Sequence, residues 1–431
     1  MSSSFVLKSA TLADGSVSDI LITGNVISAV GSNLSGDEII DCSGLIALPG
    51  FVDLHTHLRE PGFEQSETVL TGTQAAALGG FTAVHAMANT SPVADTAGVV
   101  EQIFSLGKEA GYAEVFPIGA VTVGLDGKQL AELGAMANSK AQVKVFSDDG
   151  KCVHDPVLMR RALEYVKAFG GVVAQHAQEP RLTEGAQMNE GKVSAELGLV
   201  GWPKVAEESI IARDVLLAEH VDSRVHICHL STAGSVEIVR WAKARGIKVT
   251  AEVTPHHLLL TDELVRSYDA VYKVNPPLRT EADVLALREA LIDGTIDIIA
   301  TDHAPHPIEA KDCEWNAAAF GMLGLETAAS IAQLVLVDSG KSNWRRLAEV
   351  LSQNPAKIGQ DANQGQDLVA GAHANITLID PTAKRTIVAE SASKSINNPY
   401  VGMELPGRVI HTIFGGYFTV RDGNLAAIGR A

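Results

Sequence analysis

Gly50-Phe-Val-Asp-Leu-His-Thr-His57 is the stretch that decides the fold and the chemistry of this 431-residue chain. It is an apolar segment typical of a buried strand, and it ends in two histidines separated by one residue. Alternate residues of a strand point to the same side, so both imidazoles project in one direction. Two such imidazoles at a strand end form half of a transition-metal site. The alternative for this motif alone is a pair of surface or capping histidines.

Strand-like and helix-like segments alternate along the chain after residue 50. Apolar residues recur at steps of three and four in segments 155–169, 205–220, 235–245 and 281–292, which predicts amphipathic helices. Eight short apolar segments typical of buried strands lie around them, at 50–54, 81–85, 114–119, 142–146, 172–175, 225–228, 248–253 and 297–300. Eight strand–helix alternations predict an α/β fold, a TIM-type (β/α)8 barrel over residues 50–366. A doubly wound sheet is the alternative.

Both ends of the chain are β-like. Short, largely β-branched segments punctuated by turn residues occur at 5–7, 20–22, 26–30 and 39–40, and again at 374–379, 409–414 and 417–420. We therefore predict that residues 1–49 and 367–431 pair into one small β-sandwich domain beside the barrel.

Charge and composition exclude several classes of function. Lys and Arg total 34 and Asp and Glu total 51, and this net charge of −17 argues against nucleic acid or an anionic membrane as a partner. The start of the chain lacks a signal-peptide pattern, and no apolar run approaches the roughly 18 residues of a membrane span. The four cysteines form no C-x-x-C pair, which favours reduced thiols and a cytoplasmic location.

Further imidazoles and carboxylates follow other predicted strands. His176 and His229 end two of them, Asp148-Asp149 follows a third, and Asp302 follows the last. The ends of parallel barrel strands meet at one mouth, so these side chains should converge on the first histidine pair. Neutral imidazoles and carboxylates suit zinc, with manganese or cobalt as substitutes. Their number exceeds the need of one catalytic zinc and predicts two ions, roughly 3.5–4 Å apart, that share a hydroxide.

Four motifs carry a resemblance to a known family. GFVDLHTHLREPG at 50–62, FSDDG at 146–150, VNPPLR at 274–279 and ATDHAPH at 300–306 resemble class I bacterial dihydroorotases of the amidohydrolase superfamily. The resemblance spans nearly the whole chain. It implies a barrel with a small β-sandwich, two zinc ions per subunit, and the reversible cyclisation of N-carbamoyl-L-aspartate to L-dihydroorotate in pyrimidine (UMP) biosynthesis.

The resemblance also implies a role for each candidate ligand. His55, His57 and Asp302 would hold the more buried ion, His176 and His229 the more exposed one, and Asp149 would bridge them. Many relatives, including hydantoinases, use a carboxylated lysine as the bridge, for which Lys144 is the candidate here. The Asp-Asp-Gly motif is similar to the subgroup that uses aspartate, which favours Asp149.

The expected mechanism follows from these ligands. The ions lower the pKa of bound water toward about 7, which supplies a metal-bridging hydroxide to attack the ring amide carbonyl. Asp302 is the expected general base that then returns the proton to the leaving ring nitrogen as a general acid. The alternative is that Asp302 serves only as a ligand.

Substrate recognition requires a cation for the ring carboxylate. Arg59 lies two residues after the histidine pair, and a guanidinium offers bidentate contacts that a lysine cannot. The alternative for Arg59 is a surface salt bridge with Glu60 or Glu64. The family resemblance adds Asn89 and His306 to the carboxylate contact.

The resemblance further implies that Asn275 binds the polar atoms of the ring and that the backbone of Phe320 and Gly321 contacts substrate. The alternative for both Asn275 and Asn89 is a cap at a strand end. Segment 304–320 is predicted to be a rim loop over the site.

Two other functions compete with this prediction. Dihydropyrimidinase, hydantoinase or allantoinase would act on rings that mostly lack the carboxylate, so Arg59 and Asn89 discriminate against them. An inactive barrel could serve as a scaffold, for instance for aspartate transcarbamoylase, but every matched ligand is present. Association with a transcarbamoylase and a homodimer both remain open from the sequence.

Overall fold

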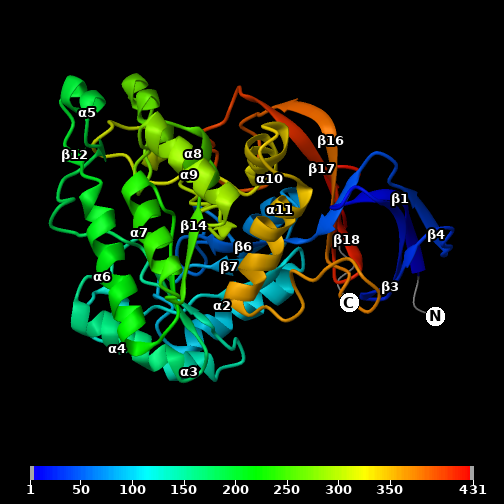
Figure 1. The fold of residues 1–431 in the computed structure, drawn as a ribbon, viewed down its shortest axis with the longest axis horizontal. Coiled ribbons are helices and arrows are strands. Elements are labelled where there is room, and N and C mark those ends of the chain that lie inside the picture. The colour runs from blue at the N-terminus through cyan, green and yellow to red at the C-terminus, as the bar shows by residue number, and fades with distance from the viewer. Residues whose placement is uncertain (1–3, 428–431) are drawn as a thin grey trace.

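The computed structural model describes residues 4–427, in which a barrel of eight parallel strands lies beside a smaller β-sheet (Figure 1). The barrel strands follow one another in chain order: β6 (Phe51–Thr56), β7 (Phe81–Ala86), β8 (Glu114–Pro117), β9 (Val145–Phe146), β10 (Val172–Gln175), β13 (Val225–Ile227), β14 (Val249–Val253) and β15 (Ile298–Ile299). Their residues are almost all buried, as expected for parallel strands covered by helices. The predicted strands are therefore confirmed, close to their predicted bounds.

The barrel closes at two junctions between its two ladders of strands, and we call these junctions seams. Strands β6–β8 form one ladder and strands β9, β10 and β13–β15 form another. Single parallel bridges join the two ladders, Gly119 with Phe146 at one seam and Thr56 with His303 at the other. Because the strands close into a ring, the alternative of an open doubly wound sheet is wrong.

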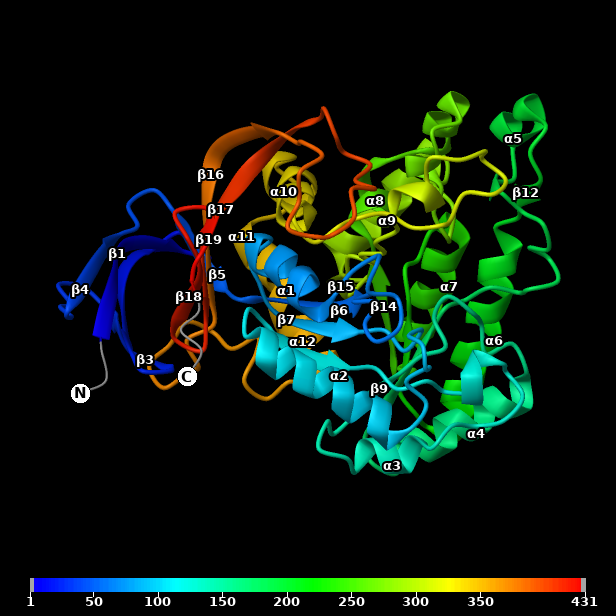
Figure 2. The same ribbon diagram turned by 180° about the vertical axis from the view of Figure 1, so that it is seen from behind.

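Helices surround the barrel, and the two views show them as an outer layer (Figures 1 and 2). The α-helices are α1 (Val69–Leu78), α2 (Ala97–Ala110), α3 (Leu133–Ala137), α4 (Pro156–Lys167), α5 (Lys192–Leu197), α6 (Val205–Val221), α7 (Ala233–Ala244), α8 (Pro255–Leu259), α9 (Glu281–Asp293), α10 (Ala328–Ala332), α11 (Trp344–Ala348) and α12 (Asn354–Gly359). Local sequence explains their starts: Asp155 caps α4 ahead of Pro156, and Thr232 caps α7. Within residues 4–427, no helix combines the length and apolarity that crossing a membrane would require.

Both ends of the chain build the smaller sheet. It contains β1 (Ser4–Leu12), β2 (Val17–Thr23), β3 (Val26–Gly31), β4 (Glu38–Asp41), β5 (Ile46–Pro49), β16 (Ile376–Thr386), β17 (Glu404–Phe414), β18 (Tyr417–Arg421) and β19 (Asn424–Leu425). Strand β5 joins the two halves, because it pairs with β1 on one side and with β16 on the other. The prediction that both termini form one small β-structure is confirmed for the described residues.

This sheet folds over a core of its own. Phe5 on β1 and Phe418 on β18 are several strands apart in the sheet, yet their ring centroids lie 5.0 Å apart. Apolar residues of β1, β2, β5 and β16 share this core. Strand β5 was not predicted from the sequence, because its four residues run directly into the first barrel strand with only Gly50 between them.

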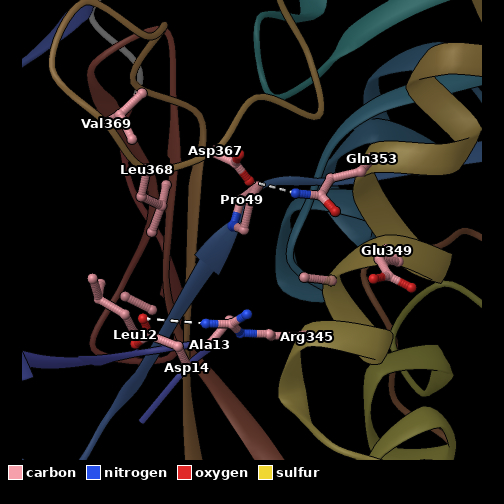
Figure 3. Close-up of a pocket in the computed structure, with 12 residues that line it drawn as sticks. Leu12, Ala13, Asp14, Pro49, Arg345, Glu349, Gln353, Asp367, Leu368 and Val369 are labelled. Carbon is pink, nitrogen blue, oxygen red and sulfur yellow. Dashed lines mark hydrogen bonds and ion pairs between the residues drawn. The ribbon is translucent and has the colours of Figure 1, made fainter. Parts of the chain in front are cut away.

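A crevice of about 420 Å³ separates the small sheet from the helices beside it (Figure 3). Two contacts cross it: Arg345 pairs with Asp14 at 3.5 Å, and Gln353 donates to Asp367. Arg345 keeps two thirds of its side chain exposed, so this contact lies at the surface. A short β11 (Met188–Asn189) and β12 (Gly201–Trp202) pair is the remaining sheet, in an excursion between β10 and α6.

Candidate metal centre and substrate pocket

The ends of five barrel strands bring the predicted metal ligands together. The residues that converge are His55 of β6, His57 directly after β6, Asp149 after β9, His176 after β10, His229 after β13 and Asp302 after β15. All of them are buried, and their side-chain N and O atoms form two overlapping groups that could each hold a metal ion. The two groups have one member in common, the carboxylate of Asp149.

One oxygen of Asp149 faces the first group. Its Oδ2 lies 3.4 Å from His55 Nε2 and 3.3 Å from His57 Nε2. The same two nitrogens lie 3.3 Å and 3.1 Å from Asp302 Oδ1. Four buried ligand atoms therefore surround one point.

The other oxygen of Asp149 faces the second group. Its Oδ1 lies 3.0 Å from His176 Nδ1 and 3.1 Å from His229 Nε2, and these two nitrogens are 2.9 Å apart. Because each carboxylate oxygen belongs to a different group, Asp149 stands between two adjacent ligand sets.

The hydrogen bonds show which imidazole nitrogens face the centre with a lone pair. His55 Nδ1 donates to Glu252 Oε1 at 2.6 Å, and His57 Nδ1 donates to Asn89 Oδ1 at 2.9 Å. His176 Nε2 donates to Gln178 Oε1 at 2.7 Å. In each ring the outer nitrogen therefore carries the hydrogen, and the inner nitrogen is available as a metal ligand.

This arrangement fits divalent metal ions. The buried His55 Nε2 has no hydrogen-bond partner, and it faces two carboxylates that can only accept. Lone pairs and carboxylates crowded together repel one another unless a cation lies between them. Two ligands each about 2.0–2.1 Å from a tetrahedral zinc lie roughly 3.3 Å apart, close to the spacing in the first group.

The pKa shifts of the candidate ligands also indicate that this site favours positive charge. Burial raises the pKa of Asp302, but the charges of His55 and His57 lower it to about 2. Burial lowers the pKa of His55, and the surrounding carboxylates, first Asp149, raise it well above its usual range. The carboxylates are thus ionised at neutral pH, and the site attracts cations or protons.

A second layer of polar residues orients these ligands, and the sequence analysis did not assign it. Glu252 receives His55 on one oxygen and His226 on the other, the latter at 2.9 Å. His226 Nδ1 in turn lies 2.9 Å from Thr250 Oγ1. A glutamate inside the largely apolar strand 249–253 was the signal that could have identified this network.

Two buried aspartates accept hydrogen bonds across the two seams of the barrel, next to the candidate metal ligands. Asp53 accepts the backbone N–H of Thr301 at 2.9 Å and also its hydroxyl. Asp148 does the same for Thr122, whose N–H lies 2.9 Å away. Burial raises the pKa of both carboxyl groups, and the threonine hydrogen bonds oppose this. Thr301 directly precedes Asp302 and Asp148 directly precedes Asp149, so the seams set where both carboxylates lie.

Backbone strain accumulates at the same strand ends. His229, Asp302 and Arg59 adopt positive φ values of 31°, 45° and 64°, which non-glycine residues rarely adopt. Such conformations persist where the surrounding structure imposes them, and they cluster at functional sites.

Lys144, the alternative bridge, lies apart from the metal centre. Its Nζ donates to the carbonyl of Phe169 at 3.1 Å, and its side chain lines a different cavity together with Glu114 and Asp361. The residue thus faces the helix layer, and Asp149 occupies the position between the two ligand sets.

A cavity of about 280 Å³ opens directly over the metal centre. It is lined by four of the predicted ligands, His57, Asp149, His176 and Asp302, and by Gly150 and Ala304. All six residues predicted to contact substrate also line it: Arg59, Asn89, Asn275, His306, Phe320 and Gly321. The structure therefore gathers the two predicted sets at one pocket.

Arg59 is held by neutral groups within this pocket. Its Nε donates to the carbonyl of Pro305 at 3.2 Å, and its Nη2 lies 3.5 Å from His306 Nε2. Glu60 and Glu64 instead accept backbone N–H groups, so the predicted alternative of a salt bridge with either one is wrong in the described chain. A guanidinium without a carboxylate partner remains available to an anionic ligand.

The two asparagines have different surroundings. Asn89 accepts from His57 and so supports a candidate metal ligand as well as lining the pocket. Asn275 donates to Gln178 at 3.1 Å, and its buried Oδ1 has no hydrogen-bond partner. An unpaired buried oxygen in a pocket wall is a ready acceptor for a ligand N–H.

Solved structures with the same fold include an L-hydantoinase from Arthrobacter aurescens, with a TM-score of 0.88 and 23% identity over 99% of this chain and 98% of the other. A dihydropyrimidinase from Brevibacillus agri gives a TM-score of 0.83 and 25% identity, over 98% and 96% of the two chains. A family model described as "Dihydro-orotase-like" matches residues 44–235. With the buried His/Asp clusters, this fold defines a metal-dependent cyclic amidohydrolase.

Curated relatives narrow this class. The dihydroorotase of Streptomyces coelicolor is 70% identical over 97% of this chain and 99% of its own length. The dihydroorotase of Leifsonia xyli is 68% identical over 99% and 98%, and that of Mycobacterium tuberculosis is 53% identical over 96% and 97%. The chain belongs to the dihydroorotase family.

Proposed function

We propose that this chain catalyses the reversible ring closure of N-carbamoyl-L-aspartate to L-dihydroorotate with two zinc ions per chain. The observation that carries the proposal is the pair of ligand sets that meet at Asp149 under a pocket containing an unpaired guanidinium. His55, His57 and Asp302 would hold one ion, His176 and His229 the other, and Asp149 both. When bound, these ions supply Lewis-acid activation of water and of the amide carbonyl at neutral pH.

Asp302 is the proposed proton carrier. Its Oδ1 faces His55 and His57, whereas its Oδ2 has no hydrogen-bond partner in residues 4–427, and the residue lines the pocket. The neighbouring imidazoles keep this carboxylate ionised at neutral pH, so it is available as an acceptor for the proton of the attacking water. In hydrolysis Asp302 then delivers that proton to the ring nitrogen as the amide bond breaks. Ring closure reverses both transfers.

The remaining pocket residues orient the substrate. Arg59 would bind the ring carboxylate, with Asn89 and His306 beside it, and Asn275 Oδ1 would accept a ring N–H. The backbone of Phe320 and Gly321, which also line the pocket, would contact the substrate. Rings without a carboxylate would leave Arg59 unpaired in a buried site, so hydantoin and dihydrouracil should be poor substrates.

We further propose the domain boundaries. Residues 50–366 would form the catalytic barrel, and residues 1–49 and 367–431 the small domain, a β-sandwich made by the curled sheet. The pairing of β5 with β16 and the separate core of the curled sheet support this division.

The direct test is turnover of L-dihydroorotate by the zinc-loaded protein, followed through the loss of ring absorbance. We expect the protein to hydrolyse L-dihydroorotate. We expect hydantoin and dihydrouracil to be neither good substrates nor strong inhibitors. Equal or faster turnover of either neutral ring would refute the proposed substrate.

A further inference from the structure

The pocket wall formed by Phe320 and Gly321 belongs to a long loop, residues 304–321, that follows β15. His306 Nε2 donates to the carbonyl of Phe320 at 2.8 Å. Gly321 has a φ of 145°, and a Cβ there would lie 2.8 Å from Ala304 Cβ. The two ends of the loop are therefore in close contact beside the pocket.

Lys311 holds the loop to the chain segment that precedes Asn275. Its Nζ donates to the carbonyls of Ala270 at 3.0 Å, Lys273 at 2.9 Å and Ala319 at 2.7 Å. All three hydrogens of the ammonium group are thereby used. The last of these carbonyls directly precedes Phe320, so Lys311 ties the pocket wall to segment 270–273.

Lys273 makes the reciprocal connection. Its buried Nζ donates to the carbonyls of Trp315 at 2.6 Å and Asn316 at 3.3 Å, and lies 4.5 Å from the centre of the Phe320 ring. Its own carbonyl accepts the N–H of Gly321 at 2.9 Å. Both residues of the pocket wall thus contact Lys273.

Neither ammonium group pairs with a carboxylate in the part of the chain that the structure describes; both are solvated by main-chain carbonyls. Burying a charge in this way is costly unless it is fully hydrogen-bonded.

We propose that Lys273 and Lys311 are positioning residues that fix Phe320 and Gly321 for substrate binding, without taking part in metal binding or proton transfer. This inference rests on the proposed function. It predicts that the two lysines control affinity for the ring substrate and leave the chemical step unchanged.

The test compares Lys311→Met and Lys273→Met with Lys192→Met, a control whose side chain is 83% exposed on α5. Loss of either lysine should raise KM for dihydroorotate about tenfold, as expected for residues that support a binding group. The values of kcat and zinc content should stay within about twofold of those of the unmodified protein. Unchanged KM in both variants, or an equal loss of kcat and zinc, would overturn the proposal.

Hydrogen exchange provides a second measurement that needs no turnover and no intact pocket chemistry. Amides of segment 319–321 should exchange faster in both variants than in the Lys192→Met protein, while segment 55–57 keeps its protection. If segment 319–321 exchanged at the same rate in these variants as in the Lys192→Met control, the proposed role of the two lysines would be refuted. Absence of turnover in the Lys192→Met control would instead refute the proposed function, and the exchange result would still decide the role of the lysines.

Discussion

The metal centre and the substrate pocket wall are neighbours that are built in different ways. The metal centre takes its residues from the ends of barrel strands, and buried carboxylates such as Glu252 and Asp53 orient them. The pocket wall takes His306, Phe320 and Gly321 from one loop, which lysines hold through main-chain carbonyls. Metal binding and substrate binding therefore depend on different supporting residues, and substitutions should be able to impair one without the other.

The largest effect is expected at Asp149, which both ligand sets share. Asp149→Ala should lose both ions and lower turnover by about 10³-fold or more, because the metal pair contributes several kcal/mol to catalysis. Zinc content and dihydroorotate turnover measure this. Lys144→Met is the matched control and should keep both. The reverse pattern would mean that a modified Lys144 is the bridge.

Asp302→Asn separates proton transfer from substrate binding. The amide keeps the shape of the carboxylate but cannot carry the proton, so kcat should fall by about 10²- to 10⁴-fold. KM should change little, since the pocket wall is intact. Steady-state kinetics of the zinc-loaded variant measure both constants; a variant with near-normal kcat would show that Asp302 is only a ligand.

Arg59→Met tests the substrate pocket rather than the metal centre. Loss of a charged, bidentate contact of about 1.5–3 kcal/mol should raise KM for dihydroorotate about 10- to 100-fold. Zinc content should stay normal, because Arg59 contacts none of the ligands within hydrogen-bond distance. Arg59→Lys serves as the control and should recover part of the affinity. A loss of zinc in Arg59→Met would contradict the separation of the two regions.

The barrel could be predicted from the sequence because its signals are local. Each strand is a short apolar segment, and five of the eight have a candidate histidine or aspartate ligand within three residues of their C-terminal end, at the same mouth of the barrel. The small sheet was predicted less completely, since β5 depends on partners far along the chain and has no turn to mark its end.

The candidate site likewise contains residues that the sequence predicts and residues that it does not. His55 and His176 follow predicted strands directly and Asp302 follows one after a single residue, so their convergence follows from the fold. Lys273 and Lys311 carry no such signal, because a lysine in a polar loop resembles a solvated surface residue until the carbonyls around it are known. Glu252 was identifiable in principle as a charge inside an apolar strand.

The smallest expected effect concerns pH. Burial, and after it the charge of Arg59, lowers the pKa of His306 to about 3. The imidazole is therefore neutral, and its Nε2–H donates to Phe320 throughout the range from about pH 5 to about pH 8. KM for dihydroorotate should show no inflection near pH 6.5. An inflection there that disappears in His306→Asn would show that the pocket titrates through this residue.

Anomalous diffraction from crystals of the zinc-loaded protein would show whether Asp149 joins the two ligand sets. We predict two zinc peaks, one among His55, His57 and Asp302 and the other beside His176 and His229, with one oxygen of Asp149 at each. A single peak, or two peaks with Asp149 bound to only one of them, would contradict the account.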